Sequence, residues 1–132
     1  MLSKKIVSPQ PTDYPIGTFL KTEQGYFYVR GETKRFRFIT QRVLDSWSPS
    51  RVVNCSESDP GVKKLKVTSK MLFRDGSLLY SQADGKMYLI SGNKRRHIIN
   101  PDWLEALGIN RNRVPWVSLD EINLHEEGEP LK

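Results

Sequence analysis

The strongest constraint on the fold of this chain is an internal duplication. Segments 14–47 and 73–107 share one order of features: Gly followed by Thr or Ser, an apolar pair, a turn, an apolar-Tyr-apolar run, a second turn, Lys-Arg and an apolar pair. Tyr28 aligns with Tyr88, 60 residues further on. RVVNCSESD (51–59) aligns with RVPWVSLDE (113–121). Self-similarity at a fixed period indicates tandem copies of one structural unit, here of about 58 residues.

Each copy has the pattern of a small sheet followed by a short helix. Two apolar runs flank a polar turn, and a second turn leads into the Lys-Arg run, which is the pattern of three antiparallel strands. After the strands, Asn100 and Thr40 are placed to cap short helices, and Pro101 suits a first helical position. Helices of two turns are stable only when packed. Each copy then ends in Ser-x-x-acid, Ser56 to Asp59 and Ser118 to Glu121, the spacing of a capping box.

These patterns predict a mainly β fold with short helices, a small α+β protein made of two tandem repeats. Each repeat is a three-stranded antiparallel meander followed by a two-turn helix. The predicted parts are an N-terminal extended arm (1–13), repeat unit 1 (14–68), repeat unit 2 (69–124) and a C-terminal tail (125–132). Both ends carry prolines and charge, and we expect them to act as arms that pack on a partner or a neighbouring subunit.

Composition narrows the range of partners. The chain has 21 Lys and Arg against 15 Asp and Glu, a formal charge of +6, which favours acidic partners such as nucleic acid, an anionic wall polymer or an acidic protein surface. Cys55 is the single cysteine, so neither an intramolecular disulfide nor a zinc site built from thiolates is expected. The N-terminus has too few apolar residues for a signal peptide, and no run reaches the roughly 20 that a membrane helix needs. We expect a soluble chain made in a reducing cytoplasm, with no membrane partner.

The two copies resemble a short repeat found in tandem in many bacterial and bacteriophage proteins. Its form is Asp-Gly-Thr-Leu, an apolar-Tyr-apolar strand, Gly-x-Lys-Arg, a short helix and a Val-Ser segment, and the resemblance covers about residues 13–124. It implies a non-catalytic β-rich module, used in surface proteins, cell-wall enzymes and virion proteins. Copy 1 departs from the pattern at Ile16, where copy 2 has Asp75, and at Phe36, where copy 2 has Arg96. Two identical sites are therefore not expected.

Catalysis is not expected, and neither is a cofactor or a metal. His97 aligns with Arg37, so its position tolerates a permanent cation, unlike that of a general base. His125 stands in the acidic run HEEGE, where we expect it to be exposed. Cys55 aligns with the apolar Val117, which favours a buried structural thiol. The sequence contains no Gly-rich phosphate loop and no metal-ligand spacing.

The duplicated basic residues are the first candidates for partner contacts. Lys34-Arg35 and Lys94-Arg95 occur in both copies, whereas Arg37 and the pair Arg96-His97 differ between them. A shared Lys-Arg after a turn fits the solvated start of a strand, with long stems covering apolar neighbours. Alternatively, the clusters contact phosphates or an acidic surface. Nucleic acid is disfavoured, because Tyr26, Tyr28, Phe36 and Tyr88 alternate with apolar residues as in any small sheet.

Trp116 is the strongest aromatic candidate. It aligns with the polar Asn54, so its side chain is expected to point toward solvent or a partner, and tryptophan is enriched at interface hot spots. Trp47 and Trp103 lie on short helices that must face a core. The complete set of candidate partner-binding residues is Trp116, Arg96, His97, Lys34, Arg35, Arg37, Lys94 and Arg95.

From these observations we expect a non-catalytic structural protein. The leading hypothesis is a bacteriophage virion component, such as a capsid decoration, neck, tail or baseplate protein, made in the host cytoplasm. It would bind neighbouring structural proteins in a large assembly. A cell-wall or glycan-binding accessory module is the first alternative, since it would use exposed aromatics beside polar groups. A basic nucleic-acid-binding accessory protein is the second and is based on charge alone.

Overall fold

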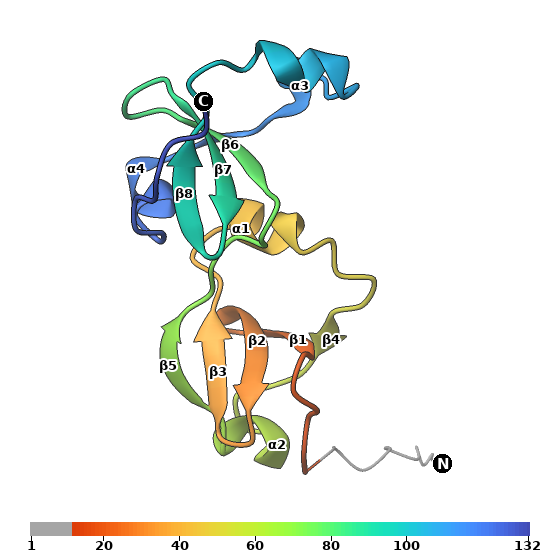
Figure 1. The fold of residues 1–132 in the computed structure, drawn as a ribbon. Coiled ribbons are helices and arrows are strands. Elements are labelled where there is room, and N and C mark those ends of the chain that lie inside the picture. Colours follow the sequence, from red (N-terminus) through yellow and green to blue (C-terminus); the bar gives the residue numbers. More distant parts are fainter. Residues whose placement is uncertain (1–11) are drawn as a thin grey trace, which may run out of the picture. The chain divides into compact units, whose positions relative to one another are not determined.

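The computed structural model describes residues 12–132, which form a mixed α+β fold dominated by strands (Figure 1). Over this range there are nine strands in two sheets, four short α-helices and one 3-10 helix. The prediction of a mainly β fold with short helices is confirmed. Most of the predicted arm 1–13 lies outside the described residues.

The described chain divides into two compact units that do not follow the sequence repeats. Unit 1 contains the chain up to Arg37 and Ser50–Ser69, and unit 2 contains Phe38–Pro49 and Lys70–Lys132. The segment 38–49, which the repeat pattern places in repeat unit 1, therefore belongs to unit 2. The predicted boundaries 14–68 and 69–124 describe the repeat in the sequence, and helix α1 (Gln41–Ser46) of the first repeat is the part that belongs to the other compact unit.

Unit 1 is built on a five-stranded sheet with the order β4-β1-β2-β3-β5. Strand β2 pairs antiparallel with β1 and with β3, and β4 pairs parallel with β1. The elements of this unit are β1 (Phe19–Thr22), β2 (Gly25–Gly31), β3 (Lys34–Arg37), β4 (Val53–Asn54), α2 (Pro60–Lys63) and β5 (Lys66–Lys70).

Alternation along these strands gives the sheet two different faces. Leu20, Phe27 and Val29 are fully buried on one face, where they pack with Val62 and Leu65. The other face carries a row of half-buried aromatic rings, in which Phe19 lies opposite Tyr28 and Tyr28 lies opposite Phe36. The first face is the core of unit 1.

Unit 2 is built on a four-stranded sheet with the order β8-β7-β6-β9. Strand β7 pairs antiparallel with β6 and with β8, and β9 pairs parallel with β6. Buried Met87, Ile98, Leu104 and Val114 form one apolar cluster of this unit. Its elements are α1 (Gln41–Ser46), β6 (Leu78–Ser81), β7 (Met87–Ser91), β8 (Lys94–His97), α3 (Asp102–Ala106), η1 (Arg111–Arg113), β9 (Trp116–Val117) and α4 (Leu119–Ile122).

Strand register corrects one detail of the sequence alignment. Arg37 lies opposite Phe27, whereas the aligned His97 lies opposite Tyr88. Phe27, and not Tyr28, therefore stands at the ladder position of Tyr88. A β-bulge between Val29 and Gly31 shifts the register in unit 1, because a bulge places one extra residue on one strand of a pair.

The buried carboxylate of Glu121 joins α1 to the rest of unit 2. Its side chain is fully buried and accepts hydrogen bonds from the Thr40 hydroxyl (2.5 Å) and from Nη2 of Arg42 (2.8 Å). The backbone N–H of Ser118 donates to the same carboxylate at 2.8 Å. Burial by itself raises the pKa of Glu121, but these hydrogen bonds outweigh it and lower the pKa to about 2. Two residues of the α1 segment, 81 and 79 residues before Glu121, therefore bind the same buried carboxylate.

Two of the four predicted caps are found, those of Thr40 and Ser118. Thr40 caps α1 by accepting from the N–H of Val43, and Ser118 with Glu121 forms a complete capping box on α4. The cap predicted at Asn100 is wrong: its side chain accepts from the N–H of Asp102, but Pro101 is the N-cap of α3, and the helix begins at Asp102. The predicted box at Ser56 is incomplete: Asp59 accepts from the N–H of Ser56, but the helix begins only at Pro60.

The C-terminal segment lies along β8 within unit 2. Single parallel bridges join Arg95 to Glu127 and Ile98 to Leu131, and the N–H of Leu131 donates to the carbonyl of His97 at 2.8 Å. Residues of the predicted tail 125–132 therefore pair with a strand of their own chain. An edge strand leaves backbone groups unpaired, and this segment covers those of β8.

The prediction of an exposed His125 was also wrong, because its ring is 1% exposed. Nδ1 lies 2.7 Å from the carbonyl of Asn93, to which it donates, and Nε2 accepts from the N–H of Phe73 at 3.0 Å. With Nε2 accepting, the imidazole is neutral. Burial lowers the pKa of His125, although the hydrogen bond to Asn93 opposes this shift.

We predict that Glu121→Gln lowers the free energy of unfolding of unit 2 by about 2–3 kcal/mol, because it removes a buried charged acceptor. All three tryptophans lie in unit 2, so urea denaturation followed by tryptophan fluorescence reports this unit selectively. The variant should also lose the stability that wild type has above about pH 4.5 and gives up as the pH falls toward 2. Exposed Asp120→Asn is the matched control, and an equal loss there would contradict the assignment.

A second prediction concerns pH. Because the pKa of His125 is lower in the folded chain, its full contribution is present above the unfolded value of about 6.5 and is lost as the pH falls below it. The stability of unit 2 should therefore fall between about pH 7 and pH 5, by at most about 1.4 kcal/mol per pH unit. His125→Gln should flatten this dependence in the same fluorescence assay. His97→Gln should retain the pH dependence of stability. If His97→Gln abolishes this dependence and His125→Gln does not, the assignment to His125 is wrong.

Candidate functional site

In unit 1, the Lys-Arg pair divides between surface and interior. Arg35 is 5% exposed and binds Glu57 with two hydrogen bonds, of 2.6 and 2.5 Å, while its Nε donates to the carbonyl of Leu65 at 3.0 Å. Its guanidinium also lies 4.2 Å from the centre of the Phe27 ring. Lys34 is exposed at the start of β3. Arg35 is thus placed as a structural residue, and only Lys34 of this pair is available to a partner.

In unit 2, Lys94 is exposed and Arg95 is half-buried. Arg95 donates to the carbonyls of Ile122 and His125, and its N–H donates to the carbonyl of Glu126 at 2.9 Å. The aligned arginines each bind the Ser-x-x-acid motif of their own copy or the segment that follows it.

The remaining basic candidates are half-buried. Nη1 of Arg37 donates to the carbonyl of Gln24 at 2.9 Å, and Nε of Arg96 donates to the carbonyl of Glu129 at 2.8 Å. The His97 ring lies 5.8 Å from that of Tyr88. Three of the eight candidates, Lys34, Arg35 and Arg37, lie in unit 1, and the other five lie in unit 2.

Trp116 is the candidate whose placement fits a binding surface. It is 49% exposed on β9, an edge strand of its sheet. Its indole stacks on Tyr80 of β6, with ring centres 4.6 Å apart and planes at 16°. The next exposed apolar residue along the chain is Leu119, which is 56% exposed. A rigid aromatic pair at a sheet edge offers apolar area with little loss of side-chain entropy on binding.

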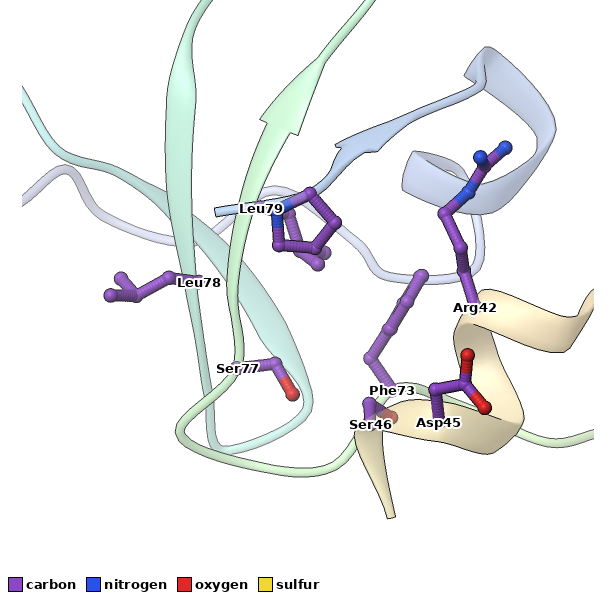
Figure 2. A pocket seen from close by; sticks show the side chains of 8 residues that line it. Arg42, Asp45, Ser46, Phe73, Ser77, Leu78 and Leu79 are labelled. Atoms are coloured by element: carbon purple, nitrogen blue, oxygen red, sulfur yellow. The ribbon is translucent and has the colours of Figure 1, made fainter. Parts of the chain in front are cut away.

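An apolar hollow lies next to Trp116 in the chain and is bounded by helix α1 (Figure 2). Its volume is about 270 Å³, and in Figure 2 the side chain of Arg42 points away from Ser77 and toward the neighbouring helix. Because Glu121 fixes α1, it also fixes one wall of this hollow. The lining residues are Arg42, Asp45, Ser46, Phe73, Ser77, Leu78, Leu79 and Pro115.

A second, polar hollow lies beside Tyr80, with a volume of about 360 Å³. Arg111 lines it and lies 3.6 Å from a carboxylate oxygen of Glu105. A hydrogen bond with Tyr80 raises the pKa of Arg111. The other lining residues are Ile109, Asn110 and Asn112.

Sequence reasoning did not identify Tyr80 or the two hollows. Tyr80 occupies the ladder position of Lys21 in unit 1. The two copies therefore differ at this position, as they differ at Trp116 and Asn54. The hollows depend on α1 and on residues 105–112, whose positions no local pattern determines.

Residues 12–132 hold no group of three or more His, Cys, Asp or Glu side chains arranged to bind a metal ion. Over the same range, no helix is both long and apolar enough to span a membrane. Cys55 is half-buried, with its thiol 3.6 Å from the carbonyl of Lys21, and burial raises the pKa of this thiol.

Comparison with protein-family models, with curated proteins and with solved structures gave no match.

Because Arg35 is buried and Lys34 is exposed, substitutions of the two residues should affect the stability of unit 1 differently. Arg35→Lys should lower its free energy of unfolding by about 1–3 kcal/mol, because lysine cannot reproduce the paired bonds to Glu57 together with the bond to Leu65. Lys34→Ala should change it by less than about 0.5 kcal/mol. Denaturation followed by far-UV circular dichroism measures both variants, and equal effects would contradict a buried structural role for Arg35.

Proposed function

We propose that this chain is a non-catalytic assembly protein that binds a neighbouring structural protein through the surface around Trp116. The main support is the half-exposed indole of Trp116 at the edge of a sheet, which stacks on Tyr80 with ring centres 4.6 Å apart. Interface hot spots are enriched in tryptophan and tyrosine that fill or flank pockets.

A tandem duplication is part of this proposal. In unit 1, the N–H of Gly17 donates to the carbonyl of Val29 at 2.8 Å, and in unit 2 the N–H of Gly76 donates to that of Ile90 at 2.7 Å. The hydroxyls of Thr18 and Ser77 each bind the carbonyl three residues earlier, both at 2.6 Å. Such repeated details support descent from one unit of three antiparallel strands and a helix.

The surroundings of Trp116 favour a protein partner. The apolar hollow lined by Pro115 can accept an aliphatic side chain, and Leu119, three residues after Trp116, is a further exposed apolar residue. Asp45 and Arg111 stand at the two hollows as charged groups. An apolar centre with charged residues around it is the usual composition of a protein interface.

Within this proposal the protein is a bacteriophage virion component, for which the resemblance of the repeats is the support. A capsid decoration, neck, tail or baseplate position would each require contacts with neighbouring subunits and no catalytic step.

A glycan-binding module is the second candidate, and the polar hollow favours it. An exposed aromatic platform can stack on a sugar ring, while Glu105, Asn110 and Arg111 offer planar polar groups to vicinal hydroxyls.

Trp116→Ala tests the proposal. Binding to each structural protein encoded beside this chain, measured between purified full-length proteins by biolayer interferometry, should weaken by about 30-fold or more. The melting temperature should change little, since half of the indole already faces solvent.

Exposed Lys86→Ala, at the β6–β7 turn, is the control and should leave the affinity unchanged. If the wild-type chain binds purified wall polysaccharide and none of the structural proteins, the glycan candidate replaces this proposal. If Trp116→Ala lowers the melting temperature without affecting binding, Trp116 belongs to the core.

A further inference from the structure

The net charge of the protein is concentrated in one unit. Residues 12–37 and 50–69 of unit 1 contain nine Lys and Arg against five Asp and Glu, a formal charge of +4, whereas unit 2 contains ten of each. Two of the nine cations are paired within unit 1, Arg35 with Glu57 and Lys64 with Asp13. An acidic partner would therefore be attracted to unit 1 and not to the Trp116 surface of unit 2.

Aromatic rings on one face of this sheet are accompanied by cations. The Nζ of Lys21 lies 5.6 Å from the centre of the Tyr26 ring, and the guanidinium of Arg30 lies 5.5 Å from that of Phe36. Tyr26 and Phe36 are on the face opposite the core. The sequence disfavoured nucleic acid because its aromatics alternate with apolar residues, but the register separates the two sets onto opposite faces.

A hollow of about 560 Å³ lies where this face meets the β2–β3 turn and β5. Arg30 and Lys34 line it, and neither forms an ion pair with any residue in the described range. One side of the hollow is the Phe36 ring, and all five residues of β5 are exposed. The remaining lining residues are Gly31, Glu32, Thr33, Thr68 and Ser69.

The aligned turn of unit 2 is built differently and serves as an internal control. There, Asp75 accepts from the N–H groups of Gly92 and Asn93, at 3.1 and 3.0 Å, and the C-terminal segment covers β8. Unit 1 has Ile16 in place of Asp75, and its strand bulges between Val29 and Gly31. Arg30 is the residue at this bulge, and its guanidinium lies over the Phe36 ring.

We propose that this hollow binds single-stranded nucleic acid, with Arg30 and Lys34 contacting phosphates and Phe36 stacking on a base. Cations beside an aromatic ring are the combination that recognises a single strand, because the phosphates need charge and every base has a face to stack. Thr33, Thr68 and Ser69 add hydroxyl donors for phosphate or sugar oxygens. Tyr26 with Lys21 continues the same chemistry further along the face.

Fluorescence anisotropy with the full chain and a labelled oligodeoxythymidine of about 15 nucleotides tests this proposal at about 0.15 M salt. The double variant Arg30→Ala/Lys34→Ala should bind at least about tenfold more weakly and show a smaller salt slope, by about one for each phosphate that is no longer neutralised. Phe36→Leu should weaken binding by about fivefold or more while leaving the salt slope unchanged. Glu32→Gln should strengthen binding, because it removes a lining carboxylate that repels phosphate.

Lys86→Ala/Lys94→Ala carries the same charge change in unit 2 and is the matched control; it should bind as wild type does. Circular dichroism melting of each variant separates lost binding from lost folding, and the Glu32→Gln gain needs no such correction. The proposal is overturned if wild type does not bind, or if the control loses as much affinity as the Arg30/Lys34 variant. It is also overturned if poly-glutamate displaces the oligonucleotide at equal charge while Phe36→Leu has no effect, an outcome that indicates an acidic protein partner.

Discussion

Unit 2 depends on one buried negative charge. Glu121 is surrounded by groups from two distant parts of the chain: Thr40 and Arg42 at the start of α1, and the N–H of Ser118 at the start of α4. A buried carboxylate is destabilising unless its oxygens accept hydrogen bonds. Detachment of α1 would remove donors from Glu121 and would therefore lower the stability of unit 2. The ion pair therefore places the helix of one sequence repeat in the compact unit of the other. It also fixes the apolar hollow that Pro115 lines, because Arg42, Asp45 and Ser46 form part of its wall.

The two units are both built on small sheets, but the surfaces of the sheets differ. Unit 2 covers the outer edge of β8 with its own C-terminal segment and is electrically neutral, and Trp116 at the other edge of its sheet is one of its exposed apolar residues. Unit 1 carries the surplus of cations, and its β5 is exposed along its whole length. A protein partner at one unit and an anionic chain at the other are compatible, since the two proposals use no residue in common.

Local patterns predicted local structure well. The mainly β class, the Thr40 cap and the Ser118–Glu121 capping box all depend on neighbouring residues. Sequence reasoning failed where the partner is distant: the burial of His125 follows from contacts with Asn93 and Phe73, which lie 32 and 52 residues away. The alignment of Tyr28 with Tyr88 failed because a bulge in one strand shifts the register without leaving a clear trace in composition. Of the candidate site, comparison of the copies found Trp116, while the hollows required the packing of α1 and of residues 105–112.

The division of the Lys-Arg pairs has a consequence for how such repeats diverge. Arg35 and Arg95 each hold the closing segment of their own copy, whereas Lys34 and Lys94 face solvent. Under the proposed duplication, replacing the arginine removes internal hydrogen bonds of its copy, whereas replacing the solvent-facing lysine removes none that the structure gives. As copies of this unit accumulate substitutions, the second position of the pair should change only when its acceptor changes with it. The first position, that of Lys34 and Lys94, can change without a matching change elsewhere in its copy.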